Sequence, residues 1–155
     1  MKKVALKFLA FALLLSFSLA FFSCEGEEGS LSAVEKIAAA FPLKYGEIYS
    51  DELSDGDARY FTDEMKTLVL GENAMKYDFI VSVSGYFSRD RVSAEEVIVI
   101  QLDDRSHRAE ITAALYRRAS KKQDVPTGVL CQGDLVYFIC ASNPERIIEY
   151  IKTKM

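Results

Sequence analysis

Hydrophobic residues recur along this chain with two periods, one typical of helices and one typical of strands. Between Val34 and Phe41 the spacing is helical. Ser32 and Glu35 form a capping box, in which a hydroxyl and a carboxylate satisfy the free amides at a helix start. We therefore predict a first helix that begins at Ser32 and ends before Pro42.

The middle of the chain predicts a short helix and then two adjacent strands. The helix runs from Thr62 to a stop at Gly71. Residues 77–87 alternate, with apolar side chains on one face and Ser82 and Ser84 on the other, which predicts a strand with one face in water. Residues 96–102 are apolar on both faces, so we predict a strand at the centre of the sheet.

The last third of the chain predicts a helix, a hairpin and a final helix. Asp103 or Asp104 caps the first of these helices, whose buried stripe comprises Ile111, Ala114 and Leu115. Gly133-Asp134 lies between two apolar runs and has the form of a two-residue hairpin turn. Asn143 and Pro144 then open the final helix.

This order of elements favours an α+β domain. We predict an antiparallel four-stranded sheet, built from two strand pairs, with helices packed on one face. Residues 43–60 show no regular hydrophobic spacing, carry three tyrosines and five acids, and are predicted to be irregular. Their acids do not fit a calcium loop, because Leu53 stands where an oxygen ligand is needed, so we expect a solvated acidic loop.

The first 24 residues have the layout of a bacterial secretion signal. Three lysines precede an apolar run from Phe8 to Phe22, and Ser23 stands before Cys24. A small residue followed by cysteine is typical of lipoprotein processing. We therefore predict three parts: a signal peptide (residues 1–23), a lipidated Cys24 with a flexible tether (residues 24–30), and a single α+β domain (residues 31–155).

Two other outcomes for the N-terminus stay open, because Phe21 and Phe22 are bulkier than the residues usual before such a cysteine. Cleavage after Ala20 would release a soluble protein, and an uncleaved segment would itself be the anchor. All three outcomes agree on export. With lipidation, the expected location is the extracytoplasmic face of the cell membrane, since two or more acyl chains hold a protein firmly.

The net charge of the mature chain limits the classes of partner that it is suited to bind. Loss of the signal peptide lowers the basic residues from 19 to 16, against 23 acidic residues, so the net charge becomes −7. An acidic surface is poorly suited to nucleic acid or anionic headgroups. We therefore expect no nucleic-acid partner and attachment to the membrane through the lipid alone.

Cys131 and Cys140 flank the predicted hairpin turn. The turn sets Cys131 opposite Val136, which leaves Cys140 four residues further along its strand, about 13 Å away at ~3.3 Å per residue. A disulfide needs Cα atoms within about 7 Å of each other. We predict that the two thiols stay unbonded, although export would permit a disulfide.

Three stretches resemble a known family in layout: residues 94–100 leading into the Asp103-Asp104 helix, residues 132–138, and the closing helix from Pro144 to Ile151. From about Tyr77 to Lys152 the chain is similar to bacterial lipoproteins of the domain of unknown function family 4358. The resemblance implies a fold and an envelope location. It implies no site residues.

No catalytic motif, metal-ligand cluster or cofactor-binding loop occurs in the sequence. His107 is the only histidine, so a multi-histidine zinc site is excluded and a serine triad has one candidate base. We expect His107 to be solvated at a helix start. A basic cluster is expected to complement a helix dipole, with an anion contact as the alternative; it comprises Arg117, Arg118, Lys121 and Lys122.

Aromatic residues gather in the irregular segment and suggest a candidate binding surface, since tyrosine combines apolar area with a polar hydroxyl. Its members are Tyr45, Tyr49, Asp57, Arg59, Tyr60 and Phe61. The alternative is that these rings complete the core. We expect a non-enzymatic, membrane-anchored lipoprotein that binds an envelope protein or a small ligand. The alternatives are a small carboxylate-dependent hydrolase or transferase and a structural accessory of the envelope.

Overall fold

The computed structural model describes residues 28–90, 94–122 and 124–155, which fold around a five-stranded antiparallel sheet. Its strands are β1 (Gly46–Ser50), β2 (Ile80–Ser88), β3 (Glu96–Leu102), β4 (Thr127–Gln132) and β5 (Leu135–Cys140). Across the sheet the order is β1-β2-β3-β5-β4. The predicted α+β class and antiparallel sheet are confirmed, but the sheet has five strands and not four.

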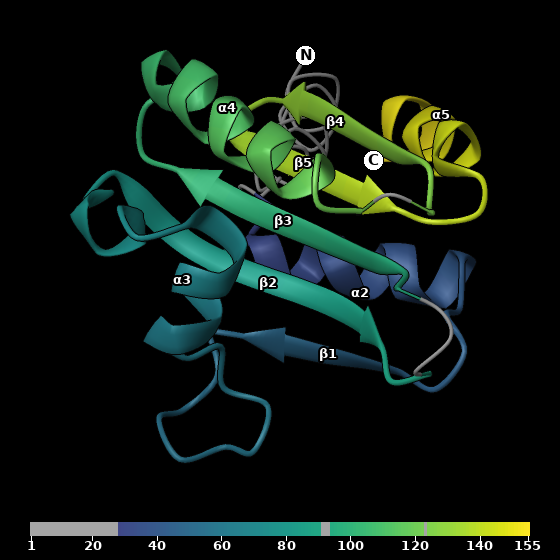
Figure 1. Ribbon diagram of the computed structural model, residues 1–155, viewed down its shortest axis with the longest axis horizontal. Helices are drawn as coiled ribbons and strands as arrows, with labels where there is room; N and C mark the ends of the chain where they lie inside the picture. The colour runs from purple at the N-terminus through teal and green to yellow at the C-terminus, as the bar shows by residue number, and fades with distance from the viewer. Residues whose placement is uncertain (1–27, 91–93, 123) are drawn as a thin grey trace, which may run out of the picture.

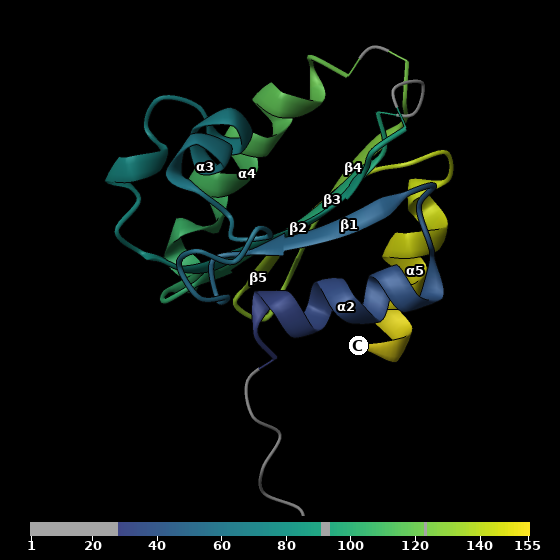
Figure 2. The ribbon, with the colours of Figure 1, turned by 90° about the horizontal axis from the view of Figure 1, so that it is seen from below.

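Helices cover both faces of the sheet, so the prediction of helices on one face is wrong (Figures 1 and 2). One face carries α3 (Asp63–Leu70) and α4 (Arg108–Ala119), and the other carries α2 (Ser30–Ala40) and α5 (Pro144–Lys154). Short 3₁₀ helices occur at Ala74–Lys76 and Arg105–His107. Figure 2 shows the resulting three layers, with the sheet in the middle.

The additional strand, β1, lies inside the segment predicted to be irregular. Its five residues include one aliphatic side chain, Ile48, so no alternating pattern marks the strand. It pairs with β2 along its whole length, from Gly46 opposite Ser88 to Ser50 opposite Ser84. On its outer side the Ser50 amide and carbonyl bond to the segment around Tyr60. β1 is therefore an edge strand that is covered at one end.

The sequence predicted that the polar face of β2 is exposed to water, and this prediction is wrong. Ser82 and Ser84 are buried beneath α2. A bulge between Ile80 and Ser82 shifts the register, so Val81 is 58% exposed whereas Val83 is fully buried. The second face of β2 is thus covered by a helix, which is why helices lie on both sides of the sheet.

Several predicted helix ends are confirmed, although Asp104 caps the 3₁₀ helix before α4 and not α4 itself. The Thr62 side chain caps α3, and Gly71, with φ 89°, ends it. Asn143 caps α5 as predicted. The capping box at Ser32 is wrong, because α2 begins two residues earlier with Gly29 as its N-cap and without a side-chain cap. The carboxylate of Glu52, which accepts from the start of α2, takes the place of the missing cap, as described below.

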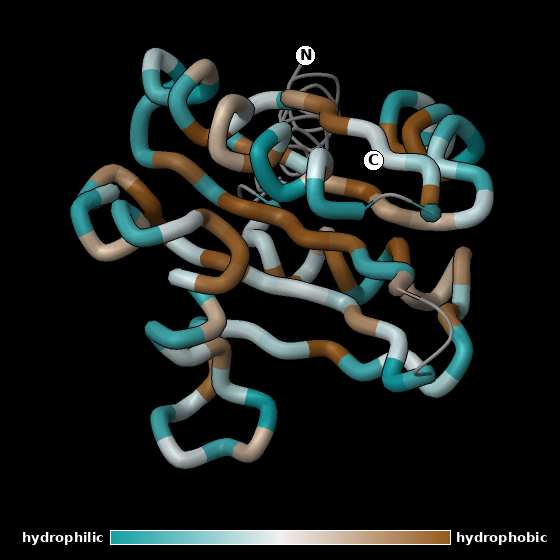
Figure 3. Tube along the Cα trace, in the orientation of Figure 1, coloured by the Kyte–Doolittle hydropathy of each residue, from teal (hydrophilic) through white to brown (hydrophobic). Residues whose placement is uncertain are grey.

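Two apolar clusters, one on each face of the sheet, form the core. β3 contributes to both, with Ile98 and Ile100 facing α3 and α4 and with Val97 and Val99 facing α2 and α5. Figure 3 shows this hydrophobic stretch running along β3 through the middle of the molecule. The predicted central position of β3 and the buried stripe of α4 are both confirmed; that stripe is Ile111, Ala114 and Leu115.

The predicted signal peptide, Cys24 and residues 25–27 lie outside the described residues. Ser30, which the sequence assigned to the tether, belongs to α2 and is fully buried. Among residues 28–90, 94–122 and 124–155, no helix has the length and apolar character needed to cross a membrane.

Candidate functional site

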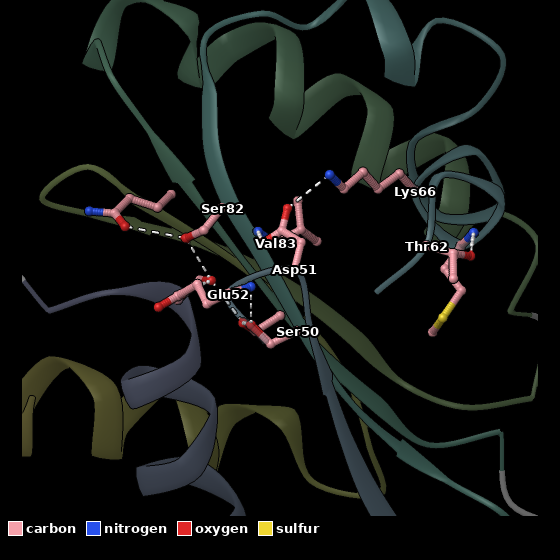
Figure 4. Close-up of polar contacts among 11 residues, drawn as sticks. Ser50, Asp51, Glu52, Thr62, Lys66, Ser82 and Val83 are labelled. Carbon is pink, nitrogen blue, oxygen red and sulfur yellow. Dashed lines mark hydrogen bonds and ion pairs between the residues drawn. The ribbon is translucent and has the colours of Figure 1, made fainter. Parts of the chain in front are cut away.

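Four buried serines form a hydrogen-bonded network where α2 meets the sheet (Figure 4). We call Ser30, Ser50, Ser82 and Ser84 the serine network; each is at most 4% exposed. The Ser30 hydroxyl lies 2.8 Å from the hydroxyls of both Ser82 and Ser84. The Ser84 hydroxyl donates to that of Ser50 over 2.8 Å. The network therefore joins the first residue of α2 to β1 and β2.

Charged and amide groups complete the serine network on two sides. The Ser30 hydroxyl and the backbone amide after it donate to Oε1 of Glu52 at 2.8 and 2.9 Å. On the other side Oε1 of Gln101 lies 3.3 Å from the Ser82 hydroxyl, and the Gln101 amide donates to Asp134 at 2.9 Å. Buried hydroxyls are costly unless they are paired. These partners fix the start of α2 in place of a side-chain cap.

A structural role suits the serine network better than a catalytic one. Ser30 is fully buried, so a substrate cannot reach its hydroxyl. His107, the only histidine, stacks on Phe79 with ring centroids 3.9 Å apart and an interplanar angle of 3°. Within the described residues, no group of three or more His, Cys, Asp and Glu side chains could hold a metal ion.

An ion pair next to the serine network ties α3 to the sheet (Figure 4). Asp51 follows β1 directly; one of its carboxylate oxygens accepts from the Val83 amide at 2.8 Å, and the other lies 2.9 Å from Lys66 Nζ. The two acids that directly follow β1, Asp51 and Glu52, therefore have different partners. Glu52 fixes α2, whereas Asp51 fixes α3.

The candidate binding residues predicted from the sequence do not form one surface. Phe61 is fully buried and belongs to the core. Asp57 and Arg59 pair in the loop after β1, where the Arg59 amide and side chain hold the pKa of the Asp57 carboxyl below its usual value. Tyr60 lies beside Ser50, at the same end of β1.

Tyr45 and Tyr49 belong to a different cluster, which extends toward the start of β1. The Tyr49 hydroxyl accepts a hydrogen bond from Arg89 at 2.9 Å and donates one to Glu47 at 2.8 Å. Arg89 also pairs with Glu47. The Tyr49 ring packs edge-on against Phe87, with centroids 5.9 Å apart. We call Tyr45, Glu47, Tyr49 and Arg89 the tyrosine corner.

Tyr45 is held in an unusual conformation and presented to solvent. Its φ of 53° lies in the left-handed region, which costs a residue other than glycine of order 1–3 kcal/mol, and its side chain is 73% exposed. The next residue, Gly46, lies against the ring of Tyr86, where an added Cβ would come within 2.2 Å. The Tyr86 hydroxyl in turn accepts from the Leu43 amide at 2.8 Å. Contacts beneath the turn therefore hold Tyr45 outward.

Two open hollows adjoin the tyrosine corner. One has a volume of about 470 Å³ and is lined by Tyr45, Gly46, Glu47 and Arg89. The other, of about 480 Å³, extends from Lys44 to Pro126 and Ser142. Lys44 pairs with Asp90 at 3.1 Å and lies 5.7 Å from the centre of the Tyr45 ring. Both hollows are open to solvent, and together they offer an aromatic ring, cations and carboxylates.

The basic cluster of α4 is divided between two roles. Arg118 contacts the buried carboxylate of Glu96 at 2.5 and 2.7 Å, and Lys122 lies 3.1 Å from the same carboxylate. Arg118 also donates to a backbone carbonyl of α3. Arg117 and Lys121 stay at the surface and line a small groove between α3 and α4. The predicted role of complementing the helix dipole therefore does not describe Arg118 and Lys122, because their main partner is the Glu96 carboxylate.

Cys131 and Cys140 are both free, as predicted. Cys131 lies opposite Val136 and Cys140 lies opposite Thr127, so the two thiols are far apart in the register. Burial raises the pKa of the Cys140 thiol. Cys131 is half-buried, and its sulfur lies 3.5 Å from the Thr112 hydroxyl. A buried, protonated thiol is a poor nucleophile.

Comparison with known proteins adds no relative: no family model, curated protein or solved structure matches this chain. The resemblance to family 4358 stays a prediction, and the inferences about function rest on the geometry.

Sequence reasoning missed Glu47 and Arg89 of the tyrosine corner. Glu47 stood in the supposed loop, and Arg89 stood in a supposed turn some 40 residues away from Tyr49.

Proposed function

We propose that this protein is an extracytoplasmic lipoprotein anchored through Cys24, and that its domain is a non-enzymatic module that binds another envelope protein or a small ligand. The observation that supports it best is the complete burial of Ser30, only six residues after Cys24. Six residues reach about 20 Å when fully extended. A lipid at Cys24 would therefore hold a rigid domain close to the bilayer.

The same attachment would leave the tyrosine corner at a distance from the anchored start of α2. Ser30 lies next to Ser50, the last residue of β1, whereas Tyr45 precedes the first. The two ends of a five-residue strand are about 13 Å apart. Tyr45, at the other end of β1 from the anchored start of α2, would then stay accessible to a partner. A ligand with a carboxylate or an aromatic group suits the ring and guanidinium found there.

The mass of the mature protein tests the anchor. Lipidation gives a chain that begins at Cys24 and carries acyl groups, and Cys24→Ala then abolishes both the added mass and the membrane retention. A soluble chain that begins at Phe21 would contradict the anchor and favour cleavage after Ala20. A chain that still begins at Met1 would show an uncleaved segment.

Photo-crosslinking in intact membranes tests the binding role. A photo-reactive phenylalanine analogue replaces Tyr45 in the full chain, and the matched control carries it at Asp55, an exposed position in the loop at the other end of β1. We expect one reproducible product from position 45, none from position 55, and loss of the product with Arg89→Ala. Capture of the same products from both positions would contradict a binding surface at the tyrosine corner.

The alternative of a carboxylate-dependent hydrolase or transferase lacks a specific observation in its favour among the described residues. The carboxylate of Glu47 pairs with Arg89, and that of Glu96 is held by two cations. Glu52 accepts from the buried start of α2. Each of these carboxylates has a partner that explains its position without a substrate.

A further inference from the structure

The outer edge of β4 is an open row of backbone hydrogen-bonding groups. The two-residue turn makes Gln132 and Leu135 a hydrogen-bonded pair, so every second residue of β4 bonds to β5. Pro126 fits this alternation, since its carbonyl accepts from Ala141. The amides and carbonyls of Thr127, Val129 and Cys131 therefore point away from β5. No described residue supplies a partner for them.

The other edge of the sheet is protected, and β4 is not. At β1 the segment around Tyr60 bonds to Ser50, and Glu47 and Arg89 place charges along the strand. Such coverage and charges are common protections of edge strands. Residues 127–132, in contrast, contain no charged residue and no proline, and all six are half-buried.

Thr112 and Ile148, both neutral, lie at this edge on opposite faces of the sheet. On one face Thr112 of α4 contacts Cys131. Tyr116, one helical turn further along and on the same side of α4, is 58% exposed. On the other face Ile148 of α5 lies over Gly128, where an added Cβ would come within 2.7 Å of its side chain. A partner at β4 would therefore contact hydroxyl, aromatic and aliphatic groups.

We propose that β4 pairs antiparallel with β4 of a second copy of this chain. The three outward-facing residues are evenly spaced, so a two-fold axis through Val129 sets Val129 against its equivalent and Thr127 against Cys131 of the second copy. These three pairs make about six hydrogen bonds. The two sheets become one continuous sheet, and Tyr116 of each copy lies near the axis.

A second copy suits this edge better than an unrelated partner for two reasons. First, residues 127–132 carry no charge, so two copies of this edge do not repel each other, even though each mature chain as a whole is acidic. Second, a two-fold axis perpendicular to the sheet keeps α2 and α5 of both copies on the same side. Both chains then leave their first helix toward one surface, which a pair attached to a single bilayer requires. Attachment would also raise the effective concentration of the copies.

Crosslinking of the full chain in its membrane tests the β4 pair. A photo-reactive phenylalanine analogue replaces Tyr116, and the matched control carries it at Leu68 of α3, which is 72% exposed. We expect a product of twice the chain mass from position 116, joined to α4 or β4 of the second copy, and none from position 68. Thr127→Pro should reduce this product about tenfold or more, since it removes outward donors and no internal hydrogen bond.

The remaining outcomes overturn the proposal. These are an equal yield from positions 68 and 116, a product unaffected by Thr127→Pro, capture of a different protein at position 116, and no product at all. If Thr127→Pro fails to fold, sedimentation of the detergent-solubilised chain with Tyr116→Glu replaces it. That change sets like charges near the axis and should reduce the dimer, whereas Leu68→Glu should leave it unchanged. The result does not depend on what the tyrosine corner binds.

Discussion

Replacing Glu96 with glutamine tests the buried ion cluster that joins β3 to α4. The Glu96 side chain is 5% exposed, and those of Arg118 and Lys122 are 11% and 19% exposed. Glutamine keeps the shape but removes the charge that both cations face. Breaking a buried ion pair from one side costs about 3–5 kcal/mol. Because Lys122 can turn partly into water, we expect a loss near the lower end, about 3 kcal/mol.

Urea unfolding followed by circular dichroism measures this loss as a change in the midpoint at constant slope. The matched control is Glu47→Gln, which breaks the pair with Arg89, whose side chain is 63% exposed. An exposed pair contributes about 1 kcal/mol or less. A loss below about 1 kcal/mol for Glu96→Gln, or equal losses for the two variants, would refute the reasoning.

A second substitution separates the ion pair from packing. Arg118→Met removes the cation that lies closest to Glu96 but keeps much of its apolar stem. If unpaired charge causes the loss, the double variant with Glu96→Gln should be more stable than the sum of the two single losses predicts, by at least about 1 kcal/mol. Strict additivity would show that Arg118 and Glu96 do not act as a pair.

Three further predictions address the register, the tyrosine corner and a thiol. Thr127→Cys should form a disulfide with Cys140, its directly opposed residue, under oxidising conditions; a folded protein without that link in peptide mapping would show that the register is wrong. Gly46→Ala should lower the free energy of unfolding by about 1–3 kcal/mol, because the added Cβ meets the Tyr86 ring. In a protein that already carries Tyr86→Leu the same change should cost less; an equal loss with Tyr86 and with Leu at position 86 in thermal unfolding would count against the contact. Burial raises the pKa of Cys140, so its contribution to stability is present below the unfolded thiol pKa of about 8.5 and declines as the pH rises above it. Alkylation of the Cys140 thiol at pH 8 should be at least about tenfold slower in the folded protein than in urea. Equal rates for Cys140 would contradict its burial.

Strong local signals in the sequence were sufficient for much of the fold. Thr62 and Asn143 cap helices because their side chains reach amides a few residues away. Gly133 adopts φ 60° in a two-residue turn, which needs no distant partner. The apolar run of β3 predicted its central place, since a strand that is apolar on both faces requires cover on both.

The errors arose where polar residues depend on distant partners. Ser82 and Ser84 indicated a wet face, but four serines that bond to one another can be buried under a helix, and the sequence does not show that they meet. β1 has too few apolar residues to be recognised alone. The tyrosine corner was predicted in part, through Tyr45 and Tyr49, whereas Phe61 proved to be part of the core.

The strand order makes completion of the sheet depend on the last part of the chain. β5 lies between β3 and β4, so one edge of the apolar strand β3 has no neighbour until residues 135–140 arrive. A chain that crosses a membrane with its N-terminus first would deliver α2 and four strands, β4 among them, before that gap can be filled. An export intermediate that ends before Leu135 would therefore display an unfinished sheet to proteases and chaperones, and the finished chain would hide it.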